Sequence, residues 1–351
     1  MRRKTLGNKS LFGMALLILL FLITGWVSYG DAAESPEKFY KGKIMKIVVS
    51  ARPGGGSDLA ARLIAPYIVK YTGASSVAIE NNSKAGGLMA KNYVFNNATP
   101  DGLTLGLDPG SIPFQNYLMG EPGAKYDLVS APWIANFDHQ PWLGLVGAKS
   151  SYRSIKDLKS AKGLKFGGAS PGGGISVSSA LVLYLFNLDG RVITGFRGTT
   201  GVALAMGKGE LDGGSGQTSN VMKNMEQGYV RPLVVLEYER VKEIPDVPTV
   251  SELIQLTDEQ KEILDLHISV PTTKMMSAPP GTPKDRVQFL RDAIEKIKKD
   301  PQFEKDIEKA MGIPCTWVSL KETEKLAQKA TEARKKGSYK KLDQVLERYR
   351  R

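Results

Sequence analysis

The chain has 351 residues, enough for two packed cores, and 42% hydrophobic with 24% charged residues is an ordinary globular composition. Lys and Arg outnumber Asp and Glu by 48 to 36, and the net charge of +12 fits an anionic ligand or an anionic surface. Nucleic-acid binding is disfavoured, because much of the basic excess lies in 284–351, where Lys and Glu alternate as on a solvated helix face.

The N-terminal segment 1–33 predicts a secretory signal peptide. Four basic residues precede an apolar run from Leu11 to Ile23, and small residues follow as far as Ala33. An uncleaved membrane anchor is the alternative, but the run falls short of the roughly 20 apolar residues that a bilayer span needs. Cys315 is the single cysteine, so no internal disulfide is expected, and no cysteine follows the apolar run to carry a lipid. We therefore expect export as a soluble periplasmic protein.

The region after residue 33 alternates β-rich runs with helical patterns, which is typical of parallel sheets with crossover helices. Strands are predicted at 44–50, 77–80, 103–107, 143–146, 164–168, 191–196, near 210–213 and at 232–236. Helices are predicted after the strands at 44–50, 77–80 and 164–168, ending near Tyr71, Asn97 and Asn187, and the chain from residue 282 onward is mainly helical.

Glycine-rich turns between a strand and a helix are the informative feature. They read Pro53-Gly54-Gly55-Gly56-Ser57-Asp58, Ala85-Gly86-Gly87 and Ser170-Pro171-Gly172-Gly173-Gly174. Glycine lets the backbone approach a ligand, and the start of the following helix offers unpaired N–H groups that suit a carboxylate. The alternative for any one of these loops is a turn that only reverses the chain. The predicted ligand-binding residues are Arg52, Pro53, Gly54, Gly55, Gly56, Ser57, Asp58, Gly86, Gly87, Ser170, Gly172, Gly173, Gly174 and Arg197.

Nucleotide binding and catalysis are poorly supported. No Lys follows the glycines as a phosphate-binding loop requires, and the dinucleotide fingerprint is not matched. Gly168 to Gly172 does match the nucleophile motif of α/β-hydrolases, with Ser170 as nucleophile and His267 downstream. Pro171, however, lacks the N–H that the oxyanion hole of such a hydrolase needs. An exported hydrolase therefore remains only an alternative.

Other side chains offer little chemistry. His139 and His267 are the only histidines, so neither a catalytic residue, a metal site nor a cofactor is expected. His139, next to Asp138, is interpreted as a surface-loop residue, and a ligand contact is the alternative. The aromatic residues Phe114, Trp133 and Trp142 are interpreted as core residues, and the lining of an apolar pocket is the alternative.

Collinear short motifs resemble the substrate-binding receptors of tripartite tricarboxylate transporters, the TctC or Bug family. The resemblance is carried by Ile47-Val48-Val49, Pro53–Asp58, Glu80-Asn81, Ala85-Gly86-Gly87, Pro100–Leu105, Ser154–Leu158, Gly172–Gly174, Gly195–Gly198, Gly209–Asp212, Val247–Glu252 and Pro280–Pro283. It departs from the family pattern at Pro171, at Asn82-Ser83-Lys84 and at Phe196-Arg197, and no His follows the second loop.

This resemblance implies an α/β, periplasmic-binding-protein-like fold of type II, with mixed sheets, flanking helices and a ligand cleft between two lobes. It implies lobe 1 at 34–146 plus 237–351 and lobe 2 at 147–236. It also implies a monomeric receptor that captures a di- or tricarboxylate, an aromatic carboxylate or an acidic amino acid for the integral-membrane permease of an ion-gradient-driven transporter. The Pro53–Asp58 and Ser170–Gly174 loops would hold the ligand, and Asp58 would organise its own loop. A sensor that presents its ligand to a signalling partner is the remaining alternative.

Overall fold

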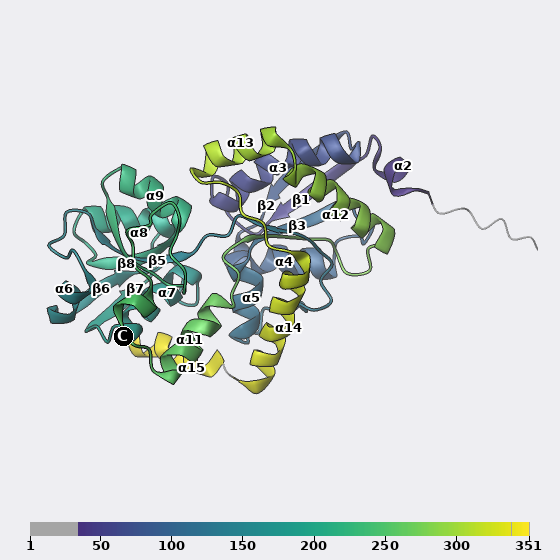
Figure 1. Ribbon diagram of the computed structural model, residues 1–351. Coiled ribbons are helices and arrows are strands. Elements are labelled where there is room, and N and C mark those ends of the chain that lie inside the picture. Colours follow the sequence, from purple (N-terminus) through teal and green to yellow (C-terminus); the bar gives the residue numbers. More distant parts are fainter. Residues whose placement is uncertain (1–33, 338, 351) are drawn as a thin grey trace, which may run out of the picture.

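The computed structural model describes residues 34–337 and 339–350, so the predicted signal peptide lies outside the described residues. Two α/β bodies lie side by side, each built around one five-stranded sheet (Figure 1). Within the described ranges, no helix is both long and apolar enough to cross a membrane.

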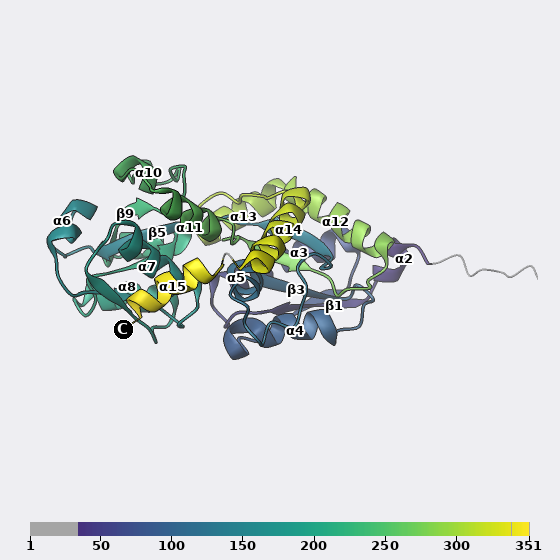
Figure 2. The ribbon, with the colours of Figure 1, turned by 90° about the horizontal axis from the view of Figure 1, so that it is seen from below.

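The first sheet combines parallel and antiparallel strands. Its order is β2 (Ser76–Asn81), β1 (Ile44–Val49), β3 (Thr104–Pro109), β10 (Lys274–Ser277) and β4 (Trp133–Phe137). Strands β1, β2 and β3 are parallel, whereas β10 runs antiparallel to both of its neighbours. The helices of this body are α2 (Pro36–Tyr40), α3 (Gly56–Thr72), the 3-10 helix η1 (Lys84–Gly87), α4 (Leu88–Asn96), α5 (Ser111–Leu118), α12 (Lys284–Lys298), α13 (Pro301–Met311) and α14 (Leu320–Lys336). In Figure 2, α4 lies on one face of the sheet and α3 and α12 on the other.

The second sheet repeats this arrangement. Its order is β7 (Gly190–Ile193), β6 (Leu164–Gly167), β8 (Gly213–Gln217), β5 (Trp142–Gly147) and β9 (Val230–Val235), with β5 antiparallel to both neighbours. Its helices are α6 (Ile155–Ser160), α7 (Gly174–Leu185), α8 (Gly198–Gly207), α9 (Thr218–Glu226), α10 (Val250–Leu253), α11 (Asp258–Ile268) and α15 (Tyr339–Tyr349). β10 in the first sheet and β5 in the second each lie next to an edge strand, and in each case the chain reaches that strand from the other body. The fold is therefore α/β with two mixed sheets, as the sequence predicts.

The chain passes between the two bodies at three places. The first is 138–141, between β4 and β5, and the second is 269–273, between α11 and β10. The third follows from the positions of α14, which packs on the first body, and α15, which packs on the second. The family resemblance implies that 237–351 belongs to lobe 1, but side chains of α10, α11 and α15 complete the core of the second sheet. That core buries Val250, Ile263, Leu264, Leu342, Val345, Leu346 and Tyr349.

Three strands differ from the pattern-based prediction. Strands β4 and β10 were not predicted, because Trp133–Phe137 and Lys274–Ser277 are buried throughout and show no alternation of apolar and polar residues. Strand β8 begins where the predicted strand near 210–213 ends, and it contains three glycines. A Cβ on Gly213, Gly214 or Gly216 would lie 2.4–2.7 Å from side chains of neighbouring elements, so close packing explains glycine in this strand.

Candidate functional site

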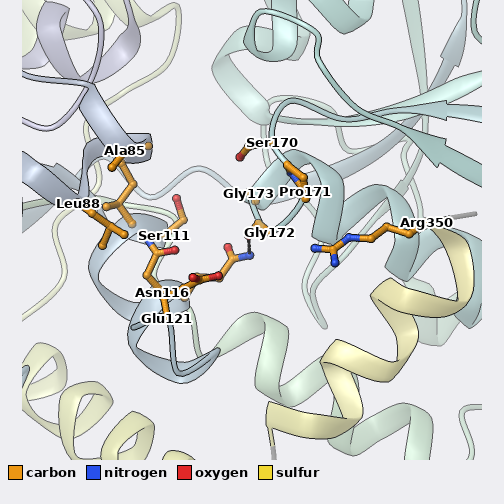
Figure 3. Close-up of a pocket in the computed structure, with 14 residues that line it drawn as sticks. Ala85, Leu88, Ser111, Asn116, Glu121, Ser170, Pro171, Gly172, Gly173 and Arg350 are labelled. Carbon is orange, nitrogen blue, oxygen red and sulfur yellow. Dashed lines mark hydrogen bonds between the residues drawn. The ribbon is translucent and has the colours of Figure 1, made fainter. Parts of the chain in front are cut away.

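A pocket of about 380 Å³ lies between the two bodies (Figure 3). The first body contributes its lining from η1, α4, α5 and the turn after α5, and the second contributes the glycine turn before α7 and the residue after α15. The lining residues are Ala85, Gly86, Leu88, Ser111, Ile112, Gln115, Asn116, Glu121, Ser170, Pro171, Gly172, Gly173, Gly174 and Arg350. The volume lies within the range of sites for small organic molecules.

Three helices begin at this pocket, two from the first body and one from the second. Their N-cap residues are Gly87 for α4, Gly110 for α5 and Gly173 for α7, and none of the three forms a side-chain cap. The first N–H groups of a helix have no acceptor within the helix, and the helix dipole places partial positive charge there. The N-termini of α5 and α7 therefore offer donors to an anion from opposite walls.

The second-body turn is held by its own hydrogen bonds. The Gly173 N–H donates to the Ser170 carbonyl at 3.1 Å, and the Ser176 hydroxyl donates to the same carbonyl at 2.6 Å. A Cβ on Gly174 would lie 2.6 Å from the Trp142 ring, and one on Gly173 would lie 2.5 Å from the Ser170 hydroxyl. Close packing therefore explains these two glycines, because neither has a positive φ.

On the first-body wall, η1 has a strained backbone. Ala85 has a φ of 50° and Gly86 a φ of 65°, so the chain turns sharply there. A Cβ on Gly87 would lie 2.4 Å from the Ser50 carbonyl, so Gly87 packs closely against the residue that follows β1. Across the pocket, the Gln115 side-chain amide donates a hydrogen bond to the Gly172 carbonyl and so joins the two bodies (Figure 3).

The Pro53–Asp58 loop does not line this pocket. It connects β1 to α3, and Arg52, Pro53, Gly54 and Gly56 are exposed. Asp58 is buried and accepts hydrogen bonds from the Gly54 N–H at 2.9 Å and from Arg62 Nε at 3.0 Å. Burial by itself raises the pKa of Asp58, but these hydrogen bonds outweigh it and lower the pKa. Asp58 therefore acts on the conformation of its own loop.

Of the predicted ligand-binding residues, the pocket lining includes Gly86, Ser170, Gly172, Gly173 and Gly174. It does not include Gly87, Arg197 or any residue of 52–58. Arg197 is exposed and occupies the N-cap position of α8.

Nine of the fourteen lining residues were not predicted, and five of these nine are polar or charged. Ser111, Gln115 and Asn116 lie on α5, Glu121 lies in the turn after it, and Arg350 follows α15. Pro109-Gly110-Ser111 is a glycine turn between a predicted strand and a helix, and this signal could have identified the α5 wall. No local pattern indicates Arg350.

The two histidines lie away from Ser170. His267 is buried on α11, and its Nε2 lies 3.5 Å from the Ser178 hydroxyl, so the structure does not pair it with Ser170. Burial lowers the pKa of His267 to about 4. His139 is partly buried in the 138–141 connector rather than in a surface loop, with its Nε2 3.2 Å from Glu237. The predicted core residues Phe114, Trp133 and Trp142 are buried.

Residues 60–343 match the family described as the tripartite tricarboxylate transporter family receptor. BugT of Bordetella pertussis is 26% identical over 255 residues, which cover 68% of this chain and 72% of BugT. A protein encoded in the tcbD–tcbE intergenic region of Pseudomonas sp. (strain P51) is 26% identical over 275 residues, 76% of each chain.

Solved structures show the same fold. MatC from Rhodopseudomonas palustris with bound malate has a TM-score of 0.65 at 23% identity, covering 87% of this chain and 99% of MatC. A second R. palustris protein, solved with adipate, has a TM-score of 0.68 at 20% identity, covering 86% of this chain and 97% of that protein. The family match covers most of the chain, and members of this family bind substrates and are not enzymes. The chain therefore belongs to the receptors of the tripartite tricarboxylate transporter family, as a solute-binding protein.

Proposed function

We propose that the chain is a periplasmic receptor that captures a small organic carboxylate in the pocket between its two bodies. The observation that carries this proposal is that α5 and α7 begin on opposite walls of one pocket, each after a glycine that forms no side-chain cap. Charge-assisted hydrogen bonds contribute roughly 1.5–3 kcal/mol each, so two or three from these amides would give micromolar binding.

The ligand-binding residues we propose are the lining residues of this pocket. From the sequence prediction they retain Gly86, Ser170 and Gly172–Gly174, and they add Ser111 and Gln115 from α5. The bound malate and adipate of the two R. palustris proteins support a dicarboxylate as the first ligand to test. Tricarboxylates, aromatic carboxylates and acidic amino acids are the other classes to include.

A thermal-shift screen of the protein without residues 1–33 tests ligand binding. Malate, adipate, citrate, benzoate and glutamate would be compared with glucose and putrescine. A ligand at 100 times its Kd stabilises the protein by about 2.7 kcal/mol, which is a clear rise in the unfolding temperature. We expect at least one carboxylate to produce this rise. A rise with the sugar or the amine and with no carboxylate would contradict the proposal.

Export and transport complete the proposal. We propose that segment 1–33 directs the chain to the periplasm and is cleaved there, and that the receptor delivers its ligand to the permease subunits of an ion-gradient-driven transporter. N-terminal sequencing of the protein from the periplasmic fraction should find a start near Ala33. Loss of the receptor should abolish uptake of the carboxylate that the screen identifies, and unchanged uptake would contradict the transport role.

A further inference from the structure

Helix α15 is attached to the second body although the helix before it in the chain, α14, packs on the first. Its residues Leu342, Val345, Leu346 and Tyr349 are buried in the second core. The Tyr349 hydroxyl donates to the Leu183 carbonyl of α7 at 3.3 Å, and Lys341 forms an ion pair with Glu262 of α11. The C-terminal end of α15 is therefore anchored next to α7, the helix whose N-terminal turn lines the pocket.

Arg350 is the residue that follows this anchored helix. Its side chain is 38% exposed, extends toward the pocket in Figure 3 and forms an ion pair with Glu347 one turn earlier. Within the described part of the chain, the pocket lining contains no other Lys or Arg. The family match ends at residue 343, so Arg350 lies outside the segment that the family shares.

Charge at the pocket is arranged unequally between its walls. Glu121 lies on the first-body side, and Arg350 lies on the second-body side with the Ser170–Gly174 turn. A carboxylate would be repelled by Glu121 and attracted by Arg350, both of which are exposed at the rim of the pocket, so salt should weaken both effects. Both the turn amides and Arg350 therefore favour the second-body wall for a negative group.

We infer that Arg350, positioned by α15, is a binding residue of this receptor that forms an ion pair with a carboxylate of the ligand. This inference rests on the proposed function, because it assigns one more contact in the same pocket. A guanidinium can donate two parallel hydrogen bonds to a carboxylate, which a Lys ammonium does not reproduce. Arg350 thereby adds affinity that the amides of the glycine turns do not supply.

The test compares Arg350→Ala, Arg350→Lys and Arg348→Ala by calorimetry with the carboxylate that gives the largest thermal shift. Arg348 is the matched control, because it is an exposed Arg on α15 whose guanidinium lies 5.4 Å from the Tyr349 ring and does not line the pocket. We expect Arg350→Ala to raise Kd about tenfold or more, and Arg350→Lys to raise it less. Arg348→Ala should leave Kd within about twofold of the unchanged protein, since exposed charges are screened by salt.

Two further readouts separate a contact from a structural effect. The unfolding temperature without ligand should be alike in Arg350→Ala and Arg348→Ala, and Kd should depend less on salt in Arg350→Ala alone. Equal Kd values for both Ala variants would overturn the assignment of Arg350 while leaving the proposed function intact. If no carboxylate binds the unchanged protein, the proposed function fails, and this inference is overturned with it.

Discussion

In the Ser170–Gly174 turn, Gly172 and Gly174 differ in how much space surrounds them. Gly174 packs against the Trp142 ring, where an added Cβ would lie 2.6 Å from the ring. Gly172 is more open, and a Cβ there would approach nothing nearer than Glu121 Oε1 at 3.9 Å. The core of the second body therefore limits the size of the side chain at position 174, whereas at position 172 only the pocket limits it.

Substitution Gly174→Ala should lower the free energy of unfolding by about 1–3 kcal/mol, because Trp142 is buried and has to shift. Chemical denaturation measures this loss. Gly172→Ala is the control and should change the free energy of unfolding by less than about 0.5 kcal/mol. Equal stability of the two variants would show that the turn accommodates a Cβ at either position.

Burial of His267 makes the protein less stable as the pH falls. The pKa of His267 falls from 6.5 to about 4 in the folded protein, so folding favours the neutral ring. The contribution of neutral His267 to the free energy of unfolding is fully present above pH 6.5 and is lost as the pH falls from 6.5 toward 4. The loss is at most about 3 kcal/mol. His267→Gln should remove this part of the pH dependence, as measured by denaturation between pH 4 and 8.

His139→Gln is the control for that experiment. Burial by itself lowers the pKa of His139, but the hydrogen bond and the charge of Glu237 outweigh it and raise the pKa. Its contribution is therefore present below pH 6.5 and is lost as the pH rises, so His139→Gln should keep the acid sensitivity that His267 causes. Loss of the acid sensitivity in the control would contradict the assignment to His267.

At the scale of elements, the 138–141 connector is fixed by buried polar contacts. Asp138 has a φ of 59° and forms an ion pair with Lys274 of β10 at 3.0 Å, and both side chains are less than 10% exposed. The Asp138 N–H donates to the Thr316 carbonyl at 2.7 Å, and the Gln140 side chain accepts from the Ser219 N–H at 2.7 Å. One connector therefore contacts both bodies.

Substitution Lys274→Met should destabilise the protein by about 3–5 kcal/mol, because it leaves the Asp138 carboxylate buried without its partner. The double variant Asp138→Asn with Lys274→Met should recover part of this loss, since no unpaired charge remains. Lys46→Met is the control, because its ion pair with Glu80 is exposed and contributes no more than about 1 kcal/mol. A loss as small as that of the control would contradict a structural role for the pair. Urea denaturation measures all three.

At the scale of the whole molecule, a hydrogen bond across the pocket joins the two bodies. Gln115 of α5 donates to the Gly172 carbonyl across the pocket and holds the walls together in the structure described here. A hydrogen bond contributes about 1 kcal/mol, so its loss would lower the ratio of molecules with the two walls joined to molecules with the walls apart about fivefold.

Gln115→Ala should therefore shift the protein without ligand toward more open arrangements, with a larger radius of gyration in small-angle X-ray scattering. It should also weaken binding of the carboxylate found by the screen. Asn116→Ala is the control, because Asn116 is the next residue and lines the same pocket. If both variants have the radius of gyration of the unchanged protein, the Gln115 contact does not control closure.

The sequence by itself determined the α/β class, most strands of both sheets and the family, because these depend on short-range periodicity and on collinear turn motifs. It also identified the Ser170–Gly174 turn, whose glycines form one wall of the pocket. The tertiary structure decided the opposite wall, where Ser111 and Gln115 of α5 lie instead of the Pro53–Asp58 loop. It also decided that α10, α11 and α15 complete the second body and bring Arg350 to the pocket. The contacts of Gln115 with Gly172 and of Tyr349 with Leu183 join residues 57 and 166 positions apart. Such pairings depend on how the faces of helices and sheets pack, which no local pattern encodes.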